Sequence, residues 1–481
     1  MLIVMVGCVL LGLAVWFVSI FVRWEREGNE QRVPLVLLGL LVIEATLYWS
    51  PNAVPRGIFH PGSGSTQLRL PEIYITLALV GRLIARGKPT RIGLPAGLWL
   101  AFGLWLVVGS VEGGLYHNQF SQNIYEAKAI WYVVGAYALA AGVPVRRYLD
   151  SGGLLKLGNL CVGSATLLSL MTIGHVSINI NLPLLPLQSF GTIGDEGAAL
   201  FFAIGTVCFL VRMASGPVRF RDVMALVPLI ACVLLADERA VLLNLALVAA
   251  VIVIALLIGH RRGIARRFHA RLGHVVLTLL AVVGVLIAIT VIPAAVDGQP
   301  VKLPLASSYE HLFHGEAKVE SAQDRLNLAG QAEALIPQHL FIGWGLGIEF
   351  EYYETGVRQV ETISYAHNIV LDLLLRLGLI GLMLFVVAMW VSISGGLKVW
   401  RRHPDAVIAA LALALVAVLA GLLLTAFLEP LIDEYRYATM FGVSLGVLRA
   451  CVTSMAGLPV LSKGRSGVPV AATVSGGAGW D

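Results

Sequence analysis

Charged residues are scarce in this sequence: Asp, Glu, Lys and Arg make up only 13% of its 481 residues, whereas hydrophobic residues make up 58%. A typical soluble domain contains about 25% charged residues, so the composition excludes an ordinary soluble globular protein. The net charge of +5 is small, and basic loop residues that set the orientation of membrane helices account for it. The charge therefore gives no reason to expect a nucleic-acid partner.

Cysteine is also scarce, and its pattern excludes two kinds of scaffold. The five cysteines are Cys8, Cys161, Cys208, Cys232 and Cys451. Each lies inside an apolar run, and their spacing matches neither a zinc site nor a disulfide framework. Cysteines in such runs behave as small buried hydrophobic residues, so we expect no disulfide scaffold and no cysteine-bound metal.

Long apolar runs occupy most of the chain. A helix needs about 20 predominantly apolar residues to cross a bilayer, and a β-barrel would instead show ~10-residue alternating segments. Thirteen runs of suitable character occur at 2–22, 34–50, 71–85, 93–112, 127–145, 153–174, 196–214, 221–236, 239–259, 275–295, 368–395, 405–428 and 435–453. We therefore predict an all-α, polytopic transmembrane helix bundle of about 13 spans.

The basic residues of the connections predict its orientation. Lys and Arg concentrate in the connections 23–32, 82–91, 146–156, 212–221, 261–271 and 398–402, and after Arg449. The alternating connections 114–125 and 174–195 contain none. Basic connections stay on the cytoplasmic side, so we expect the N-terminus outside and the C-terminus inside. The first run lacks a preceding positive region and a cleavage site, so we expect a retained helix rather than a signal peptide.

One connection is much longer than the others. Residues 296–366 form a large external loop between spans ten and eleven. Within it, "DRLNLAGQAEALI" spaces its apolar residues as an amphipathic helix does, and "FIGWGLG" ends that pattern with glycines at alternate positions. The predicted division is therefore 1–295 for about ten spans, 296–366 for the external loop, 367–453 for three spans and 454–481 for a disordered cytoplasmic tail.

Arg239, Arg325 and His367 are the candidate catalytic residues, because the predicted topology puts all three on the outer side. Arginine presents a planar set of donors that suits phosphate, and a histidine can accept a proton from a hydroxyl. The set suits a diphosphate lipid whose sugar faces outward. Each residue also fits a structural role, since arginines at helix ends extend to the interface and His367 can belong to a helix cap with Asn368.

The residues after His367 suit structural roles. Asp372 and Arg376 are spaced i,i+4, so they can pair on one face of a helix, and we expect a structural ion pair rather than catalysis. Gly378 and Gly381 lie about 16 Å or more along the helix from His367. We expect them to let neighbouring helices approach closely in lipid.

Four further residues are candidate substrate contacts. His339 and Trp344 can shape an acceptor groove, and Asn368 adjoins His367. Tyr365, like Tyr352, can stack on a sugar or belong to the aromatic belt at the membrane interface. The sequence leaves both roles open for each of these side chains.

The sequence from His367 to Gly381 reads H-N-x9-G-x-x-G and resembles the signature of the O-antigen ligase and O-antigen polymerase superfamily. "DRLNLAGQAEALIPQHLFIGWGLG" resembles the external loop of that family, and "DERAVLLNLAL" resembles its segment around a first arginine. The likeness covers about 150 residues, from Asp237 to near Trp390. Departures from the pattern occur at Glu238, Ala240 and Leu340, and the first span is an addition.

This resemblance implies a membrane glycosyltransferase of the bacterial inner membrane. It implies that Arg239 and Arg325 hold an undecaprenyl-diphosphate-linked glycan donor and that His367 orients or deprotonates the hydroxyl of a glycan or lipid-glycan acceptor. It also implies inversion at the anomeric carbon without a metal or another cofactor. The residues agree about the metal, because the outer segment 51–70 contains no Asp or Glu and hard cations need oxygen ligands.

Two other classes of function remain as alternatives. A transporter or flippase of lipid-linked oligosaccharide would show internal repeats and several charges near the midplane of the membrane. Here Glu44 is the best candidate for such a charge, and it stands alone. A non-enzymatic assembly scaffold would leave the arginines and the His-Asn pair unexplained. Within the enzyme class, polymerase and ligase need the same donor site, so the sequence does not separate them.

Overall fold

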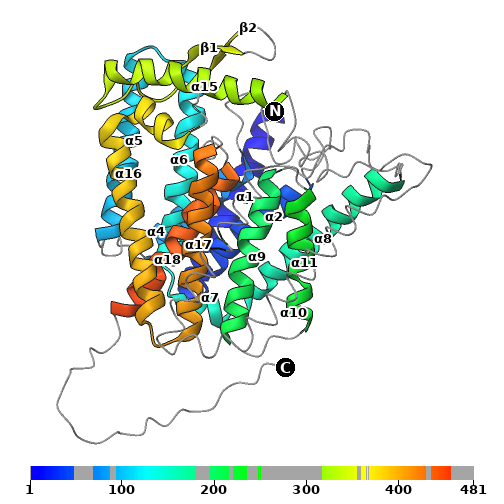
Figure 1. The fold of residues 1–481 in the computed structure, drawn as a ribbon. Helices are drawn as coiled ribbons and strands as arrows, with labels where there is room; N and C mark the ends of the chain where they lie inside the picture. Colours follow the sequence, from blue (N-terminus) through cyan, green and yellow to red (C-terminus); the bar gives the residue numbers. More distant parts are fainter. Residues whose placement is uncertain are drawn as a thin grey trace, which may run out of the picture.

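In a computed structural model of the chain, the described residues are 2–47, 69–86, 94–178, 195–215, 220–235, 248, 250, 317–354, 359–364, 366, 368–428 and 435–456. They form a helical bundle that carries a short helical and β layer across one end (Figure 1). The all-α class predicted from composition is confirmed for the bundle, and the end layer adds a two-stranded sheet that the sequence did not predict.

The described part of the bundle consists mainly of long helices. Its first part contains α1 (Leu2–Arg26), α2 (Arg32–Leu47), α4 (Leu70–Arg86), α5 (Leu94–Leu115), α6 (Phe120–Ala141), α7 (Val145–Asp150), α8 (Gly153–Ile178), α9 (Asp195–Ser215), α10 (Phe220–Met224) and α11 (Leu226–Leu235). Its second part contains α16 (Ile369–Arg402), α17 (Ala406–Leu428) and α18 (Tyr435–Ala456).

These helices coincide with eleven of the thirteen predicted spans, although 221–236 is divided into α10 and α11. Apart from residues 248 and 250, the predicted spans 239–259 and 275–295 lie outside the described residues, as does the tail after residue 456. Five described helices, α5, α8, α16, α17 and α18, are long and apolar enough to cross a membrane. The total of about 13 spans, the four-part division of the chain and its orientation therefore stay predictions.

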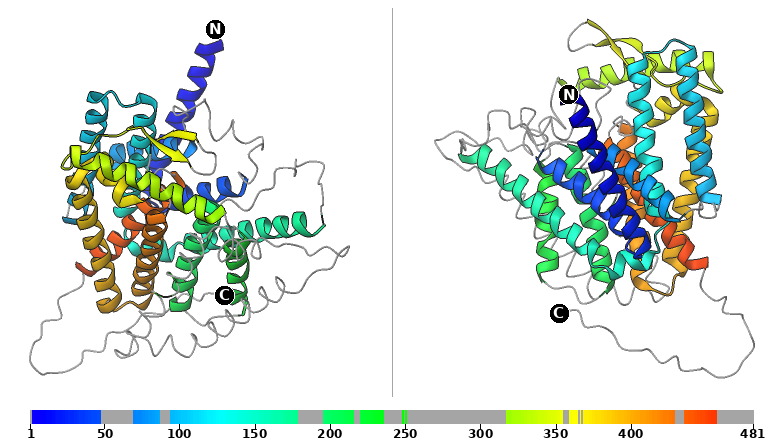
Figure 2. Two further views of the ribbon diagram at one scale, coloured as in Figure 1. Left: turned by 45° about the horizontal axis from the view of Figure 1, so that its top comes forward. Right: turned by 180° about the vertical axis from the view of Figure 1, so that it is seen from behind.

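The end layer consists of α15 (Ala317–Leu335), the 3-10 helix η3 (Ile336–His339) and the strands β1 (Phe350–Glu354) and β2 (Gln359–Ile363). The strands are antiparallel, with Phe350 opposite Ile363. The helix predicted within "DRLNLAGQAEALI" is confirmed as part of α15. Figure 2 shows α15 lying across the end of the bundle at which α5 turns into α6.

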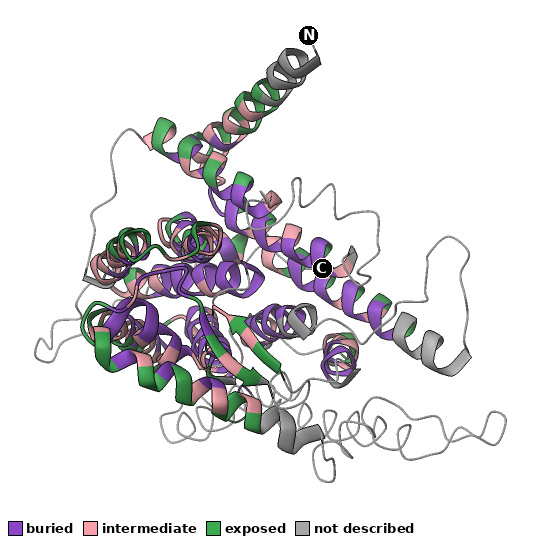
Figure 3. Ribbon diagram, turned by 90° about the horizontal axis from the view of Figure 1, so that it is seen from above, coloured by how far each residue is buried: buried purple, intermediate pink, exposed green. Residues whose placement is uncertain are grey.

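The core of the bundle lies along α6, α17 and α18. Viewed from above, buried residues occupy the middle of the bundle (Figure 3). Large apolar side chains such as Leu104, Val107 and Trp390 are exposed on its outside, as expected of a surface that faces lipid. Among the described cysteines, Cys161, Cys208, Cys232 and Cys451 are free and buried, in agreement with the expectation of small buried hydrophobic residues.

Close approach of α18 to α6 depends on small residues of α18. A Cβ atom on Gly442 would collide with the carbonyl oxygen of Val133, and one on Gly446 would lie 2.8 Å from the carbonyl oxygen of Tyr137. Small residues permit such contacts between the backbones of helices in lipid.

We predict that Gly442→Ala lowers the stability of the bundle by about 1–3 kcal/mol, because the added methyl group overpacks the contact between α6 and α18. The measurement is the midpoint of thermal unfolding in detergent. Gly163→Ala is the matched control, since a Cβ atom at Gly163 in α8 meets no atom within 4 Å. Equal midpoints for the two variants would contradict this packing.

Candidate functional site

The turn after η3 depends on glycine. Gly343, Gly345 and Gly347 have φ angles of +87°, +81° and +77°, which L side chains rarely adopt. A Cβ atom on Gly345 would collide with the backbone of Gly113 in α5, and one on Gly347 would lie 2.7 Å from the backbone nitrogen of Asn123 in α6. The helix break predicted from the alternate glycines is confirmed, and it lets the turn enter between α5, α6 and α16.

Helix α16 is broken where this turn meets it. Gly378 has φ +64° and ψ −170° inside the helix, and a Cβ atom there would collide with the backbone of Phe341. The sequence predicts a continuous helix in which Gly378 faces a neighbouring helix. The structure instead places Gly378 against a turn, because only glycine combines this backbone conformation with so close a contact.

The turn satisfies the backbone groups that the break releases. The N–H groups of Trp344 and Gly345 donate to the carbonyls of Leu375 and Arg376, at 2.8 and 3.0 Å. In return, the N–H of Leu379 donates to the carbonyl of Leu340 at 2.7 Å. Trp105 of α5 donates from Nε1 to the carbonyl of Leu377 at 2.9 Å. Irregular backbone at membrane depth is tolerated where protein groups replace its hydrogen bonds in this way.

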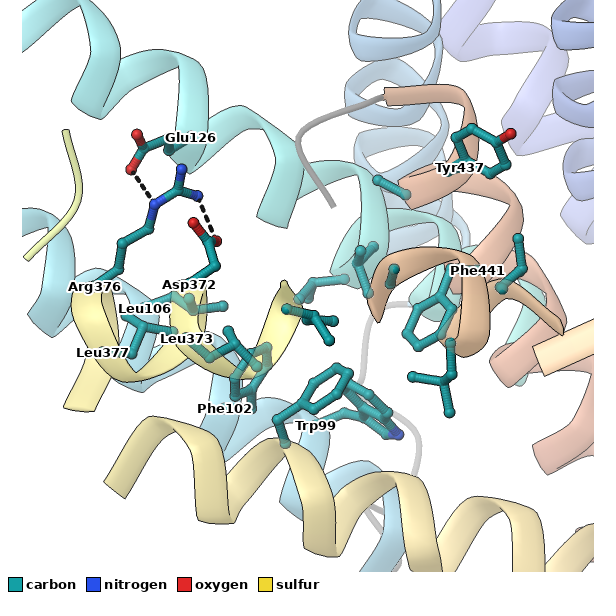
Figure 4. A pocket seen from close by; sticks show the side chains of 18 of the residues that line it. Trp99, Phe102, Leu106, Glu126, Asp372, Leu373, Arg376, Leu377, Tyr437 and Phe441 are labelled. Atoms are coloured by element: carbon teal, nitrogen blue, oxygen red, sulfur yellow. Dashed lines mark ion pairs between the residues drawn. The ribbon is translucent and has the colours of Figure 1, made fainter. Parts of the chain in front are cut away.

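A buried charge cluster lies beside the break (Figure 4). Arg376 Nη1 lies 3.0 Å from Asp372 Oδ2, and Arg376 Nε lies 3.3 Å from Glu126 Oε2 of α6. Arg376 Nη2 also donates to the carbonyl of Ser364 at 2.8 Å. The exposed fractions of Glu126, Asp372 and Arg376 are 2%, 8% and 4%, so all three charges are withdrawn from water.

The two carboxylates of the cluster fasten segments far apart in sequence. Glu126 Oε2 accepts from the N–H of Gly347 at 2.7 Å, and Asp372 Oδ1 accepts from the N–H of Ala366 at 3.2 Å. The cluster thereby joins α6, the glycine turn and the residues that lead into α16. Its role as a structural rather than a catalytic group stays a prediction, and these contacts favour it.

A small cavity lies beneath the cluster between α5, α6, α16, α17 and α18. Its walls are mostly apolar and include Phe102, Leu373 and Phe441. Its volume is about 60 Å³, whereas sites for small organic ligands enclose about 300–1,000 Å³. The cavity therefore has no room for a sugar in this conformation, so it is not a site at which a glycan could react.

The head of α16 is capped by its asparagine. Asn368 is the N-cap residue, and its side-chain oxygen accepts from the N–H groups of Val370 and Leu371 at 2.9 and 3.4 Å. Asparagine is among the preferred N-cap residues because its side chain satisfies donors that the first turn leaves unpaired. Asn368 therefore fixes where α16 begins, two residues after His367 in the sequence.

Two residues predicted to contact the substrate, His339 and Trp344, lie side by side. The rings of His339 and Trp344 have centroids 4.0 Å apart, and the ring of Tyr116 lies 4.8 Å from that of His339. Trp344 Nε1 donates to the carbonyl of Leu335 at 3.0 Å, which fixes its ring. The half-buried histidine and tryptophan, with the exposed tyrosine, form an aromatic group at the outer edge of the glycine turn.

Helix α15, which carries Arg325, packs against residues of α16 and of the segment that precedes it. Its buried residues Leu328 and Ala332 belong to the same apolar cluster as Ala366 and Leu375, and Asn327 Nδ2 donates to the carbonyl of Tyr353 in β1 at 3.0 Å. The Arg325 side chain is exposed, as a residue that contacts a substrate from the solvent side needs to be.

Arg239, Tyr365 and His367 lie outside the described residues. Gly381 completes the spaced motif, and a Cβ atom there would lie 3.1 Å from Trp105 Cδ1, so it seats α16 against α5. Sequence reasoning missed Glu126 and Tyr116. Glu126 directly precedes the predicted span 127–145, and an acid beside an apolar span was the available indication, because acids within a membrane bundle usually pair.

Comparison with known families adds the chemistry. A family model described as O-antigen ligase matches residues 224–386, about a third of the chain. The matched range contains Arg239, Arg325 and His367 together with the glycine turn and the break in α16. The resemblance to the O-antigen ligase and polymerase superfamily is therefore confirmed over this range, and it indicates a membrane enzyme of glycan transfer. No curated protein matches the chain.

We predict that Arg376→Met destabilises the protein by roughly 3–5 kcal/mol, because Glu126 and Asp372 would remain buried without their cation. Thermal unfolding in detergent measures the loss. Arg401→Met, at an exposed position of the same helix, should unfold at the wild-type temperature. A stable Arg376→Met variant would show that the cluster does not fasten this site.

Proposed function

We propose that this protein transfers a glycan from an undecaprenyl-diphosphate carrier to an acceptor hydroxyl at the outer face of the bacterial inner membrane. The family match supports glycan transfer as the activity. The apolar helices support a membrane location. Arginines and a histidine on one side of a bundle suit a donor whose leaving group is a diphosphate.

The observation that carries the proposal is the shared core under α15. Leu328, three residues after Arg325, and Ala366, the residue before His367, belong to one buried cluster. The helix that bears the arginine and the segment that bears the histidine are therefore packed as one unit. The glycine turn and the Glu126 carboxylate fasten that unit to α5 and α6.

The reaction we propose is a single displacement. The acceptor oxygen forms a bond to the anomeric carbon while the bond from that carbon to the phosphate oxygen breaks, so the configuration inverts. His367 orients the hydroxyl or takes its proton, and undecaprenyl diphosphate leaves with the electron pair. Arg239 and Arg325 stabilise the negative charge that grows on the diphosphate, which is the work that a metal ion does in other glycosyltransferases.

Acceptor contacts complete the proposal. His339 and Trp344, held in one aromatic group, offer rings on which a sugar can stack. Asn368 adjoins His367 in the sequence, and Tyr365 lies two residues before it. A transporter or flippase of lipid-linked oligosaccharide remains the alternative; it would move the lipid-linked glycan without forming a new glycosidic bond.

We predict that Arg325→Gln and His367→Ala each reduce glycan transfer in vitro by about 10²–10³-fold, the typical loss when a group that stabilises the transition state is removed. The assay follows transfer from a lipid-linked donor to the acceptor by purified protein. Glu333→Gln, at an exposed position of α15, is the matched control and should keep full activity. Full activity of a folded His367→Ala variant would exclude a catalytic role for His367.

We also predict that cells lacking the protein accumulate glycan on the lipid carrier, because both forms of the enzyme consume that donor. Mass analysis of the carrier-linked glycans separates them: single repeat units accumulate if the enzyme polymerises, and long chains if it ligates. An unchanged set of carrier-linked glycans would oppose both forms.

A further inference from the structure

A second and larger hollow opens at the opposite end of the bundle. A groove of about 630 Å³ lies between α4, α5, α6 and α18, far from α15 (Figure 1). Its volume falls in the range of ligand sites. Apolar side chains such as Leu79, Leu100 and Val134 form much of its wall. Leu83 and Trp131 line it and are also exposed on the outside of the bundle, so the groove opens toward lipid.

Three arginines line the groove: Arg82 and Arg86 near the end of α4, and Arg449 near the end of α18. Glu25 of α1 pairs with two of them, with Oε1 2.5 Å from Arg82 Nε and Oε2 2.8 Å from Arg86 Nε. One shared carboxylate does not balance three guanidinium groups. The second acid that Arg86 reaches, Glu30, also pairs with Arg147. This end of the groove is therefore positively charged.

Two residues of the groove hold buried donors that lack acceptors. Tyr137 Oη and Arg82 Nη2 have no hydrogen-bond partner among the described residues, although the other nitrogens of Arg82 contact Glu25 and the carbonyls of Ala138 and Leu139. Tyr137 is 8% exposed. Buried polar groups normally find partners. A phosphate oxygen at the cationic end would supply both with an acceptor after a small side-chain rotation.

The length of the groove matches one leaflet. Its lining runs along α6 from Trp131 to the C-cap residue Gly142, eleven residue steps that span about 16 Å of helix. The hydrocarbon core of a bilayer is about 30 Å thick, so one leaflet contributes about half of that. A single acyl chain reaches from the arginines to Trp131. The charge pattern of the connections predicts that this is the cytoplasmic leaflet.

We propose that this groove binds an anionic glycerophospholipid of the leaflet opposite the glycan-transfer site. Its phosphate lies against Arg82, Arg86 and Arg449, and one acyl chain follows the apolar wall toward Trp131. Basic pockets between transmembrane helices on the cytoplasmic side suit such headgroups. A zwitterionic lipid is disfavoured, because its ammonium group would approach three cations. The bound lipid bridges α4 and α18, and it stabilises the folded bundle by mass action.

The test uses the full-length protein, delipidated in neutral detergent and titrated with phosphatidylglycerol or phosphatidylcholine of identical acyl chains. Native mass spectrometry measures lipid retention, and thermal unfolding measures stabilisation. We expect phosphatidylglycerol to bind about tenfold more tightly, because both headgroups carry an anionic phosphate but only phosphatidylcholine adds an ammonium group, which the three guanidinium groups repel. Arg449→Gln should remove most of this preference. Tyr137→Phe should weaken the binding of both lipids about threefold, because either phosphate can accept a hydrogen bond from the Tyr137 hydroxyl.

Arg402→Gln is the matched control, because Arg402 is an exposed arginine at the same end of the bundle and does not line the groove. It should keep the preference for phosphatidylglycerol. Equal retention of the two lipids by the wild-type protein, or an unchanged preference in Arg449→Gln together with unchanged retention in Tyr137→Phe, would overturn the proposal. Inorganic phosphate is the last arm: if it raises the unfolding midpoint as much as phosphatidylglycerol does, the site recognises free phosphate and the lipid assignment is wrong.

Discussion

The break in α16 at Gly378 releases backbone groups from the helix, and the rest of the outer end of the bundle has to supply their hydrogen-bond partners. A helix broken inside an apolar environment leaves N–H and carbonyl groups without partners, and each such group is costly when it is buried. The glycine turn meets that demand with its own backbone, through the pairs Trp344–Leu375 and Gly345–Arg376. Since backbone groups point in fixed directions, the turn has one way to dock, and the end layer attached to it is held in place.

The buried charges add a second fastening that uses side chains. Arg376 lies in the segment of α16 before the break, so its guanidinium can reach Glu126 of α6 and Asp372 of its own helix. A buried ion pair contributes little net stability, because desolvation offsets the attraction. The cluster instead fixes the positions of neighbouring segments. Glu126 also accepts a hydrogen bond from the N–H of Gly347, and Asp372 also accepts one from the N–H of Ala366. The charge cluster therefore fixes the position of Ala366 relative to the first turns of α16.

Local patterns in the sequence were sufficient to predict the helices, but they did not predict the contacts between helices and turns that are distant in sequence. Apolar runs predicted the bounds of helices such as α17 and α18 to within a few residues, and alternate glycines predicted the turn at 343–347. The residues around Gly378 predict a packing position in a straight helix. They do not predict its positive φ angle, because the turn that requires this angle lies more than thirty residues earlier in the chain. Glu126 was overlooked for the same reason, since its partner Arg376 is distant in sequence. The roles of Arg239 and His367 stay predictions.

The spacing of the motif now has a physical meaning. Asn368 caps the first segment of α16 and Gly378 ends it, so the nine residues between them form a helix about 14 Å long. Each residue of an α-helix turns the chain by about 100°. One residue more or fewer would rotate the His-Asn head by that angle about the axis, while the turn stayed docked at the break. The distance from Asn368 to Gly378 therefore sets the direction in which the Asn368 cap faces relative to α15.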